Sequence, residues 1–338
     1  MKINIAIAIC VYGYAACIGA GSPYSADVYE AMAHDKSRII GEVRGATAKE
    51  ILRVVDSEEK PVMDAEIHGS FWPGANGEKY VLVDGITNIK GEYIAQGASK
   101  WRFRYRVTKS GHYSSNGDVD YLASTNVPVV KNGKWQPYGS TRTVVLKTIE
   151  KPQRLICWER TKDYKIPVYD TWLGFDFGRY QFVAPYGEGK DSDVLLRFTL
   201  KNPSRKDYHM RMEVSFTNMP YAGAYLMKKD DFSDFKNVYH ADTNATYCQS
   251  FVYSFDRYPA KRPVSVELGE DEYLVFRTRT KVDENGRLVS ANYGVLYGPW
   301  CFVGPRGMNI PFLLLNPTPN ATNLEDSEIL NRVKRMGR

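Results

Sequence analysis

Apolar runs of about four to eight residues recur along the chain from residue 46 to residue 319, separated by clusters of Gly, Pro, Asn and Asp. Runs of this length and spacing are typical of the strands of antiparallel β-sandwiches. Helical periodicity is nearly absent from this part of the chain. The pattern therefore predicts an all-β protein.

The clearest strand lies over residues 101–107, where apolar residues alternate with Arg102, Arg104 and Arg106. A period of two places the arginines on one face of a sheet and the apolar residues on the other. We expect a solvated arginine face beside acidic neighbours, and a site for an anionic partner is the alternative. The further expected strands are residues 194–200, 210–216, 247–255, 273–282, 292–303 and 310–315.

Two capping boxes signal helix starts. Thr47 and Glu50 form the first, but Pro61 and the turn at residues 56–60 leave too little room for a stable helix, so we expect a strand there. Thr322 and Glu325 form the second, ahead of an apolar helical face. This pattern predicts a short C-terminal helix over residues 320–338.

The N-terminal residues are typical of a secretory signal peptide, because Lys2 is followed by the uncharged residues 3–20. A membrane anchor is the alternative, but Asn4 and Tyr12 dilute the stretch and no basic flank follows it. We expect residues 1–26 to be a signal peptide and residues 27–45 a linker, in which residues 25–38 could form a short helix. The mature chain is then exported, as a secreted, periplasmic or cell-surface protein.

Tyr14-Ala15-Ala16-Cys17 resembles a bacterial lipobox, in which Cys17 carries the acyl chains. Tyr14 stands where that motif usually has an aliphatic residue. Cleavage near Ala20 or Ala26 is therefore the preferred interpretation, and a lipid on Cys17 is the one route by which we expect membrane attachment.

Composition and charge exclude some classes of protein. Of the 338 residues, 43% are hydrophobic and 25% charged, which is an ordinary globular composition, and the 13% that are aromatic favour strands. The net charge of +6, with acids mixed among the bases, argues against a dedicated nucleic-acid binder.

A family resemblance covers residues 46–149. Its segments are Val54-Val55-Asp56, Pro61-Val62-Met63-Asp64-Ala65-Glu66-Ile67, Thr87-Asn88-Ile89-Lys90-Gly91-Glu92-Tyr93 and Lys109-Ser110-Gly111-His112-Tyr113. They resemble the carboxypeptidase-regulatory-like domain, which usually has Asp at the position of Asn88 and Tyr at that of His112. The resemblance implies a transthyretin-like, immunoglobulin-like sandwich of about seven strands and a non-catalytic accessory role.

Residues 150–319 are expected to form a second antiparallel sandwich, of jelly-roll type. The segments 184–193, 315–320 and 324–326 are similar to those of exported bacterial proteins that join this kind of N-terminal domain to a β domain of unknown function. This similarity implies a bacterial origin and brings no activity with it.

No sequence feature identifies a reaction. The histidines are scattered without metal-ligand spacing, and there is no GxSxG elbow or phosphate loop. We expect no cofactor and no metal, and interpret residues 118–120 and 191–193 as solvated turns rather than Ca²⁺ loops. Cys157, Cys248 and Cys301 form either one disulfide and a free thiol or three buried thiols.

A hydrolase hypothesis rests on Asp170 and Asp176, which flank Trp172. Residues six apart on a strand share a face, and paired carboxylates cleave glycosidic bonds. The interpretation that we favour is two exposed acids around a packed Trp.

Binding is easier to support than catalysis. Trp72, in a turn-like sequence, Trp172 and Tyr186 are the candidate binding residues, because exposed flat rings suit sugar rings. The main expectation is a non-enzymatic exported or surface-associated protein that binds a glycan or another cell-surface polymer. The alternatives are a polysaccharide-acting hydrolase and a structural or assembly subunit that binds neighbours through strand edges.

Overall fold

The structure is a computed structural model. It describes residues 36–73, 79–123, 129–159, 163–201, 208–218, 220–230, 232–257, 272–297, 301–302, 306–310 and 312–328. The chain divides into two compact units, Met1–Thr148 and Ile149–Arg338, and each is described by itself. The expected signal peptide, Cys17 and most of the expected linker lie outside the described residues.

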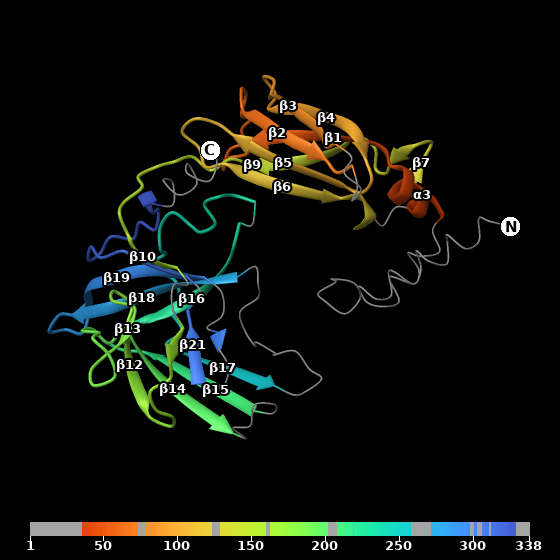
Figure 1. Cartoon of the computed structure of the whole chain (residues 1–338). Coiled ribbons are helices and arrows are strands. Elements are labelled where there is room, and N and C mark those ends of the chain that lie inside the picture. Colours follow the sequence, from red (N-terminus) through yellow and green to blue (C-terminus); the bar gives the residue numbers. More distant parts are fainter. Residues whose placement is uncertain are drawn as a thin grey trace. The chain divides into compact units, whose positions relative to one another are not determined.

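The first unit is a β-sandwich (Figure 1). In one sheet β1 pairs with β4 on one side and with β9 and the end of β8 on the other, and β8 pairs with β7. The other sheet has the order β3-β2-β5-β6. The strands are β1 (Ala46–Val55), β2 (Glu66–Phe71), β3 (Val81–Ile86), β4 (Glu92–Ser99), β5 (Arg102–Thr108), β6 (Ser115–Asp120), β7 (Val130–Lys131), β8 (Lys134–Trp135) and β9 (Ser140–Val145), with the short 3₁₀ helix η1 (Tyr121–Ala123) after β6.

Alternation along the strands builds the core of the first unit. Leu52 and Val54 of β1 and Ile67 and Phe71 of β2 are all buried, and Phe71 stacks on Phe103 with ring centroids 4.3 Å apart. The expectation of a strand rather than a helix at Thr47 to Glu50 is therefore confirmed, since these residues belong to β1. Tertiary burial of one face outweighs the local helix signal.

Two features of this unit differ in detail from the expectations. β1 pairs with β9 in parallel, so the sandwich is not wholly antiparallel. Residues assigned to a linker form helix α3 (Lys36–Arg44). Gly41 lets this helix lie against Trp135, because a Cβ there would lie 2.5 Å from the ring.

The residues that carry the family resemblance build turns. The Thr87 hydroxyl donates to Val62 O and accepts from Ala65 N, and Asn88 Oδ1 accepts from the N–H groups two and four residues later. Gly91 closes this turn with φ of 72°, and a Cβ on it would lie 2.3 Å from Val54 O. This spacing of Thr, Asn and Gly thus fixes how β3 passes into β4.

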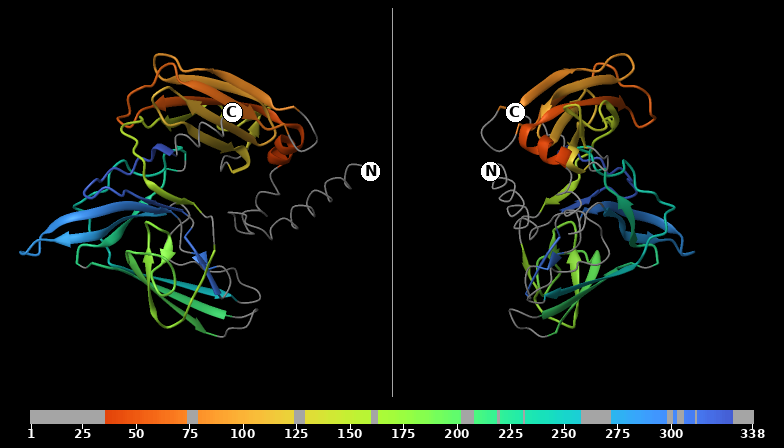
Figure 2. Two further views of the ribbon diagram at one scale, coloured as in Figure 1. Left: turned by 60° about the vertical axis from the view of Figure 1, so that its left-hand side comes forward. Right: turned by 90° about the vertical axis from the view of Figure 1, so that its right-hand side faces the viewer.

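The second unit contains two five-stranded antiparallel sheets, ordered β10-β22-β19-β18-β16 and β13-β12-β14-β15-β17, and a small sheet β11-β21-β20. Figure 2 shows the blue β18–β19 hairpin and the green β14 and β15 in separate layers. The strands are β10 (Ile156–Glu159), β11 (Tyr164–Lys165), β12 (Trp172–Asp176), β13 (Gln181–Phe182), β14 (Val194–Lys201), β15 (Tyr208–Phe216), β16 (Gly223–Lys228), β17 (Ser250–Arg257), β18 (Glu272–Val282), β19 (Leu288–Tyr297), β20 (Cys301–Phe302), β21 (Gly307–Asn309) and β22 (Phe312–Leu315).

Strands β18 and β19 are buried on both faces. Leu274 and Phe276 belong to the core between the two large sheets, whereas Tyr273 and Val275 belong to a second apolar cluster with Leu324. This double burial explains why these strands read as continuous apolar runs rather than alternating ones. The expected all-β class is confirmed.

The predicted C-terminal helix is wrong over its first turns. Asn323 and Asp326 lie in β-bridges, and the Glu325 carboxylate accepts hydrogen bonds from Glu150 N at 2.9 Å and Lys151 N at 2.6 Å. Glu325 thus binds the start of this unit instead of capping a helix. Ser327 and Glu328 are helical, and residues 329–338 lie outside the described part of the chain.

Within the described residues, no helix combines the length and the apolar character needed to cross a bilayer.

Candidate functional site

The outermost strand of the β3-β2-β5-β6 sheet carries large apolar side chains in solvent. Leu82 is 69% exposed and Ile86 is 61% exposed, and Val81 at the start of the strand is also exposed. Among the described residues, β3 pairs with β2 alone. An exposed apolar edge strand is a template for pairing with another strand.

The unpaired backbone groups of β3 can be assigned from its neighbours. Thr87 N–H bonds back to Ala65 O beside β2, whereas the Asp84 carbonyl accepts from the Tyr93 hydroxyl, 3.1 Å away on the other side. Alternate residues of an antiparallel strand direct their N–H and C=O groups to opposite sides. Leu82, Asp84 and Ile86 therefore direct their backbone groups to the open edge, and their side chains lie on the outer face of the sheet.

A small polar network lies behind this edge. His68 of β2 stands opposite Asp84, with Nδ1 and Oδ1 2.9 Å apart, and Glu66 lies 4.0 Å beyond the His68 ring. Burial, together with the charge of Asp84, raises the pKa of Tyr93, so its hydroxyl stays protonated and continues to donate to the edge. The open edge thus carries Leu82 and Ile86 on either side of the Asp84 carboxylate, which His68 holds in place.

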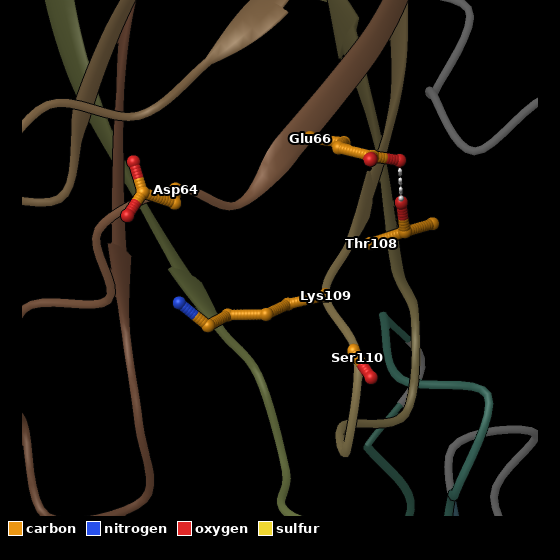
Figure 3. A pocket seen from close by; sticks show the side chains of 5 residues that line it. All are labelled: Asp64, Glu66, Thr108, Lys109 and Ser110. Carbon is orange, nitrogen blue, oxygen red and sulfur yellow. Dashed lines mark hydrogen bonds between the residues drawn. The ribbon is translucent and has the colours of Figure 1, made fainter.

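A pocket of about 370 Å³ adjoins the end of β3, because Glu66 on its wall pairs with Ile86. Its other lining residues are Asp64, Thr108, Lys109 and Ser110 (Figure 3). Thr108 donates to Glu66, and Lys109 Nζ donates to the carbonyl of Met63. Three of the pocket's polar side chains are thus already hydrogen-bonded, and the five lining residues do not form a catalytic arrangement.

The structure separates the three predicted binding residues. Trp72 is half-buried against Tyr80 and Trp101, with ring centroids 5.3 and 5.9 Å away, and its buried indole N–H has no partner among the described residues. The expectation that this ring is exposed is therefore wrong. Tyr186 is 44% exposed and Trp172 is 41% exposed, but no ring contact within the described residues joins them.

The carboxylate pair of the hydrolase hypothesis does not form. Asp170 is exposed, whereas Asp176 is buried and its two oxygens accept from four backbone N–H groups and from Arg279. Burial raises the pKa of Asp176, but these hydrogen bonds and the Arg279 charge outweigh it, so the pKa lies below its usual value. Asp176 is a structural anchor, because every lone pair that catalysis needs is already used.

Asp193 belongs to the same network. It is fully buried and accepts two bonds from Arg279, at 2.9 and 3.0 Å, one from the Thr278 hydroxyl and one from Phe177 N. Burial raises the pKa of Asp193, and its partners offset this only in part. Residues 191–193, interpreted as a solvated turn, are thus tied into the fold by a buried ion pair.

The arginine face behaves as expected. Asp118 of β6 accepts from Arg102 at 2.7 Å and lies 3.5 Å from Arg104, so the charges pair within the sheet. Neither Cys157 nor Cys248 is part of a disulfide, and the exposure of Cys248 contradicts the expectation of three buried thiols. The side chain of Cys301 is not among the side chains that the structure describes.

No group of metal-binding side chains occurs within the described residues.

Sequence reasoning missed β3. The segment Val81-Leu82-Val83-Asp84-Gly85-Ile86 is apolar at both alternating positions, which is the pattern of a strand buried on both faces. Asp84 could have indicated that one face of this strand is exposed, because a carboxylate is rarely buried without a partner.

Comparisons with known proteins assign no family. No family model and no curated protein matches the chain. Among solved structures, it is similar to 3-chlorocatechol 1,2-dioxygenase from Rhodococcus opacus (10% identity, 31% of this chain and 61% of that chain, TM-score 0.24), so it spans less than two thirds of that protein. It is also similar to a streptococcal ancillary pilin (14% identity, 66% of this chain and 59% of that chain, TM-score 0.20). A shaft pilin from Lactobacillus rhamnosus GG is a further similar structure (11% identity, 83% of this chain and 95% of that chain, TM-score 0.21). At these TM-scores none of these similarities supports an argument about function.

Proposed function

We propose that the protein is an exported, non-enzymatic assembly subunit that pairs with a second copy of itself along β3. Export rests on the signal-peptide pattern of residues 1–26. The observation that carries the assembly function is the exposed apolar edge of β3, with Leu82 and Ile86 beside unpaired backbone groups. Strand addition at such an edge joins main-chain hydrogen bonds to side-chain specificity.

The sequence of β3 suits a two-fold pairing. Leu82 and Ile86 lie symmetrically about Asp84, so an antiparallel pairing centred on Asp84 sets Leu82 of each copy opposite Ile86 of the other. In this register each residue that faces the open edge meets another one that does. The Asp84 carbonyl, which already accepts from the Tyr93 hydroxyl, has its second lone pair for the partner strand. The two Asp84 carboxylates come opposite each other, and the His68 bonded to each offsets part of their repulsion.

The energies indicate a weak association. Full burial of one Leu or Ile side chain contributes about 1.5–3 kcal/mol. The dimer buries four such side chains, two from each copy, and their burial must offset a free-energy cost of association of about 4–15 kcal/mol. Little net binding free energy remains. Loss of one anchor in each copy is therefore enough to abolish the pairing.

Sedimentation velocity over a concentration series tests this proposal. We expect the mature chain to dimerise at micromolar or higher concentrations and Leu82→Lys to be monomeric throughout, because a lysine ammonium at the edge resists burial. Val289→Lys is the matched control, since Val289 is an exposed valine on β19 of the second unit. This control should dimerise like the wild type.

Asp84→Asn tests the register. Removal of the opposed charges should tighten the dimer several-fold, since like charges directly opposite are destabilising. A wild-type chain that stays monomeric at all concentrations, or a dimer that Leu82→Lys leaves intact, would overturn the proposal. Circular dichroism of each variant shows that it is folded.

A further inference from the structure

A second exposed feature lies in the second unit, independent of β3. Trp172 opens β12 on the outer face of the β13-β12-β14-β15-β17 sheet, while Leu173 and Phe175 next to it are buried. Within the described residues, β13 pairs with β12 only at Phe175 and Asp176. The Trp172 ring therefore stands beside an open stretch of sheet edge, with 41% of the residue exposed.

Neighbours hold this ring in place. Arg197 lies directly across the strand pair, with its guanidinium carbon 4.8 Å from the Trp172 ring centroid. Glu213, directly across from Arg197 on β15, accepts from Arg197 Nη2 and from Arg211 Nε, the latter at 3.1 Å. Glu213 is largely buried, so the carboxylate anchors both guanidinium groups. A ring held in this way loses little conformational entropy when it binds a ligand.

The charges beside the ring favour an anion. Arg197 and Arg211 both pair with the single carboxylate of Glu213, so this carboxylate balances only one of the two guanidinium charges. Among the described residues, Arg197 bonds to Glu213 through Nη2, so its other N–H donors remain for a ligand. A ligand that suits this arrangement has one flat apolar face and a carboxylate at its rim.

We infer that Trp172 and Arg197 bind an acidic glycan. Because the Arg197 guanidinium covers one face of the indole, the apolar face of a uronic acid residue stacks on the other face, and its carboxylate reaches Arg197 past the edge of the ring. Arg211 acts by positioning, since it shares Glu213 with Arg197 and does not touch the ring. This ligand class is independent of self-association through β3.

Isothermal titration of the mature chain tests the inference. The probes are oligogalacturonate, oligomannuronate and hyaluronan oligosaccharides, with neutral galacto-oligosaccharides of equal length as comparison. We expect at least one acidic probe to bind more tightly than the neutral one, and the preference to shrink as salt is added. Trp172→Ala should weaken binding about tenfold or more, equivalent to about 1.4 kcal/mol.

Arg197→Gln separates the ion pair from the stacking contact. This variant should lose the preference for acidic probes, while the weaker binding through stacking on Trp172 remains. Phe232→Ala is the matched control, because Phe232 is an exposed aromatic of the same unit and its loss should leave binding unchanged. Binding of no acidic probe by the wild type, equal binding of neutral probes, or unaltered binding by Trp172→Ala would each overturn the inference. The dimer measurements on β3 variants are read separately, so failure of one proposal leaves the other standing.

Discussion

Arg279 holds two buried carboxylates in the second unit. It bonds to Asp193 through two atoms and to Asp176 at 3.0 Å, and its own backbone has φ of 52° at an irregularity of β18. A left-handed backbone is costly for a residue other than glycine. The ion pairs that this conformation allows explain why an arginine occupies it.

Arg279→Ala should lower the free energy of unfolding by about 3 kcal/mol, because it leaves Asp193 buried without its cation. Urea denaturation measures this loss. Arg104→Ala is the control, since Arg104 pairs with Asp118 on an exposed face, and its removal should cost about 1 kcal/mol or less. Equal losses in the two variants would contradict the structural role of Arg279.

The β3–β4 connection depends on one glycine. Gly91 has φ of 72° and no room for a Cβ, whereas Gly111 has φ of 77° and no atom within 4 Å of a Cβ. The two glycines share a backbone conformation and differ only in the room available for a Cβ atom. They therefore separate backbone strain from steric overlap.

Gly111→Ala should destabilise the first unit by about 1–2 kcal/mol, the cost of the left-handed conformation. Gly91→Ala should cost distinctly more, because Val54 O must also move. Urea denaturation of both variants checks the order. A Gly91→Ala loss no larger than that of Gly111→Ala would show that the turn relaxes freely.

At the scale of the whole molecule, the chain contains separate cores. Among the residues that the structure describes, one cluster of buried residues lies within residues 46–146 and two lie within residues 155–324. No residue is shared between the units, which is the arrangement of domains with their own hydrophobic cores.

Differential scanning calorimetry should therefore resolve two transitions. Gly91→Ala should lower only the transition of the first unit, and Arg279→Ala only that of the second. A single transition that both variants shift would show that the two units unfold as one.

Part of this fold was predictable from residue types in order. Residues 101–107 alternate because one face is buried, and this local pattern correctly predicted both β5 and its arginine face. The Asn88 side-chain turn is likewise local, since its Oδ1 accepts from the N–H groups of Lys90 and Glu92. The helix start predicted from the capping box at Thr322 is wrong, because Glu325 bonds instead to residues about 175 positions earlier.

Composition and alternation by themselves determined an all-β chain, its main strands and the division of each strand into buried and exposed faces, because these follow from a period of two. Only the tertiary structure decided which strand stands at an edge. Val81 to Ile86 would be an ordinary core strand if another strand covered it, and Trp172 an ordinary packed ring if β13 were longer. Asp176 similarly became an anchor rather than a catalyst when distant Arg279 reached it. Edges, pairings and ion pairs arise between segments far apart in the chain, so the local sequence does not specify them.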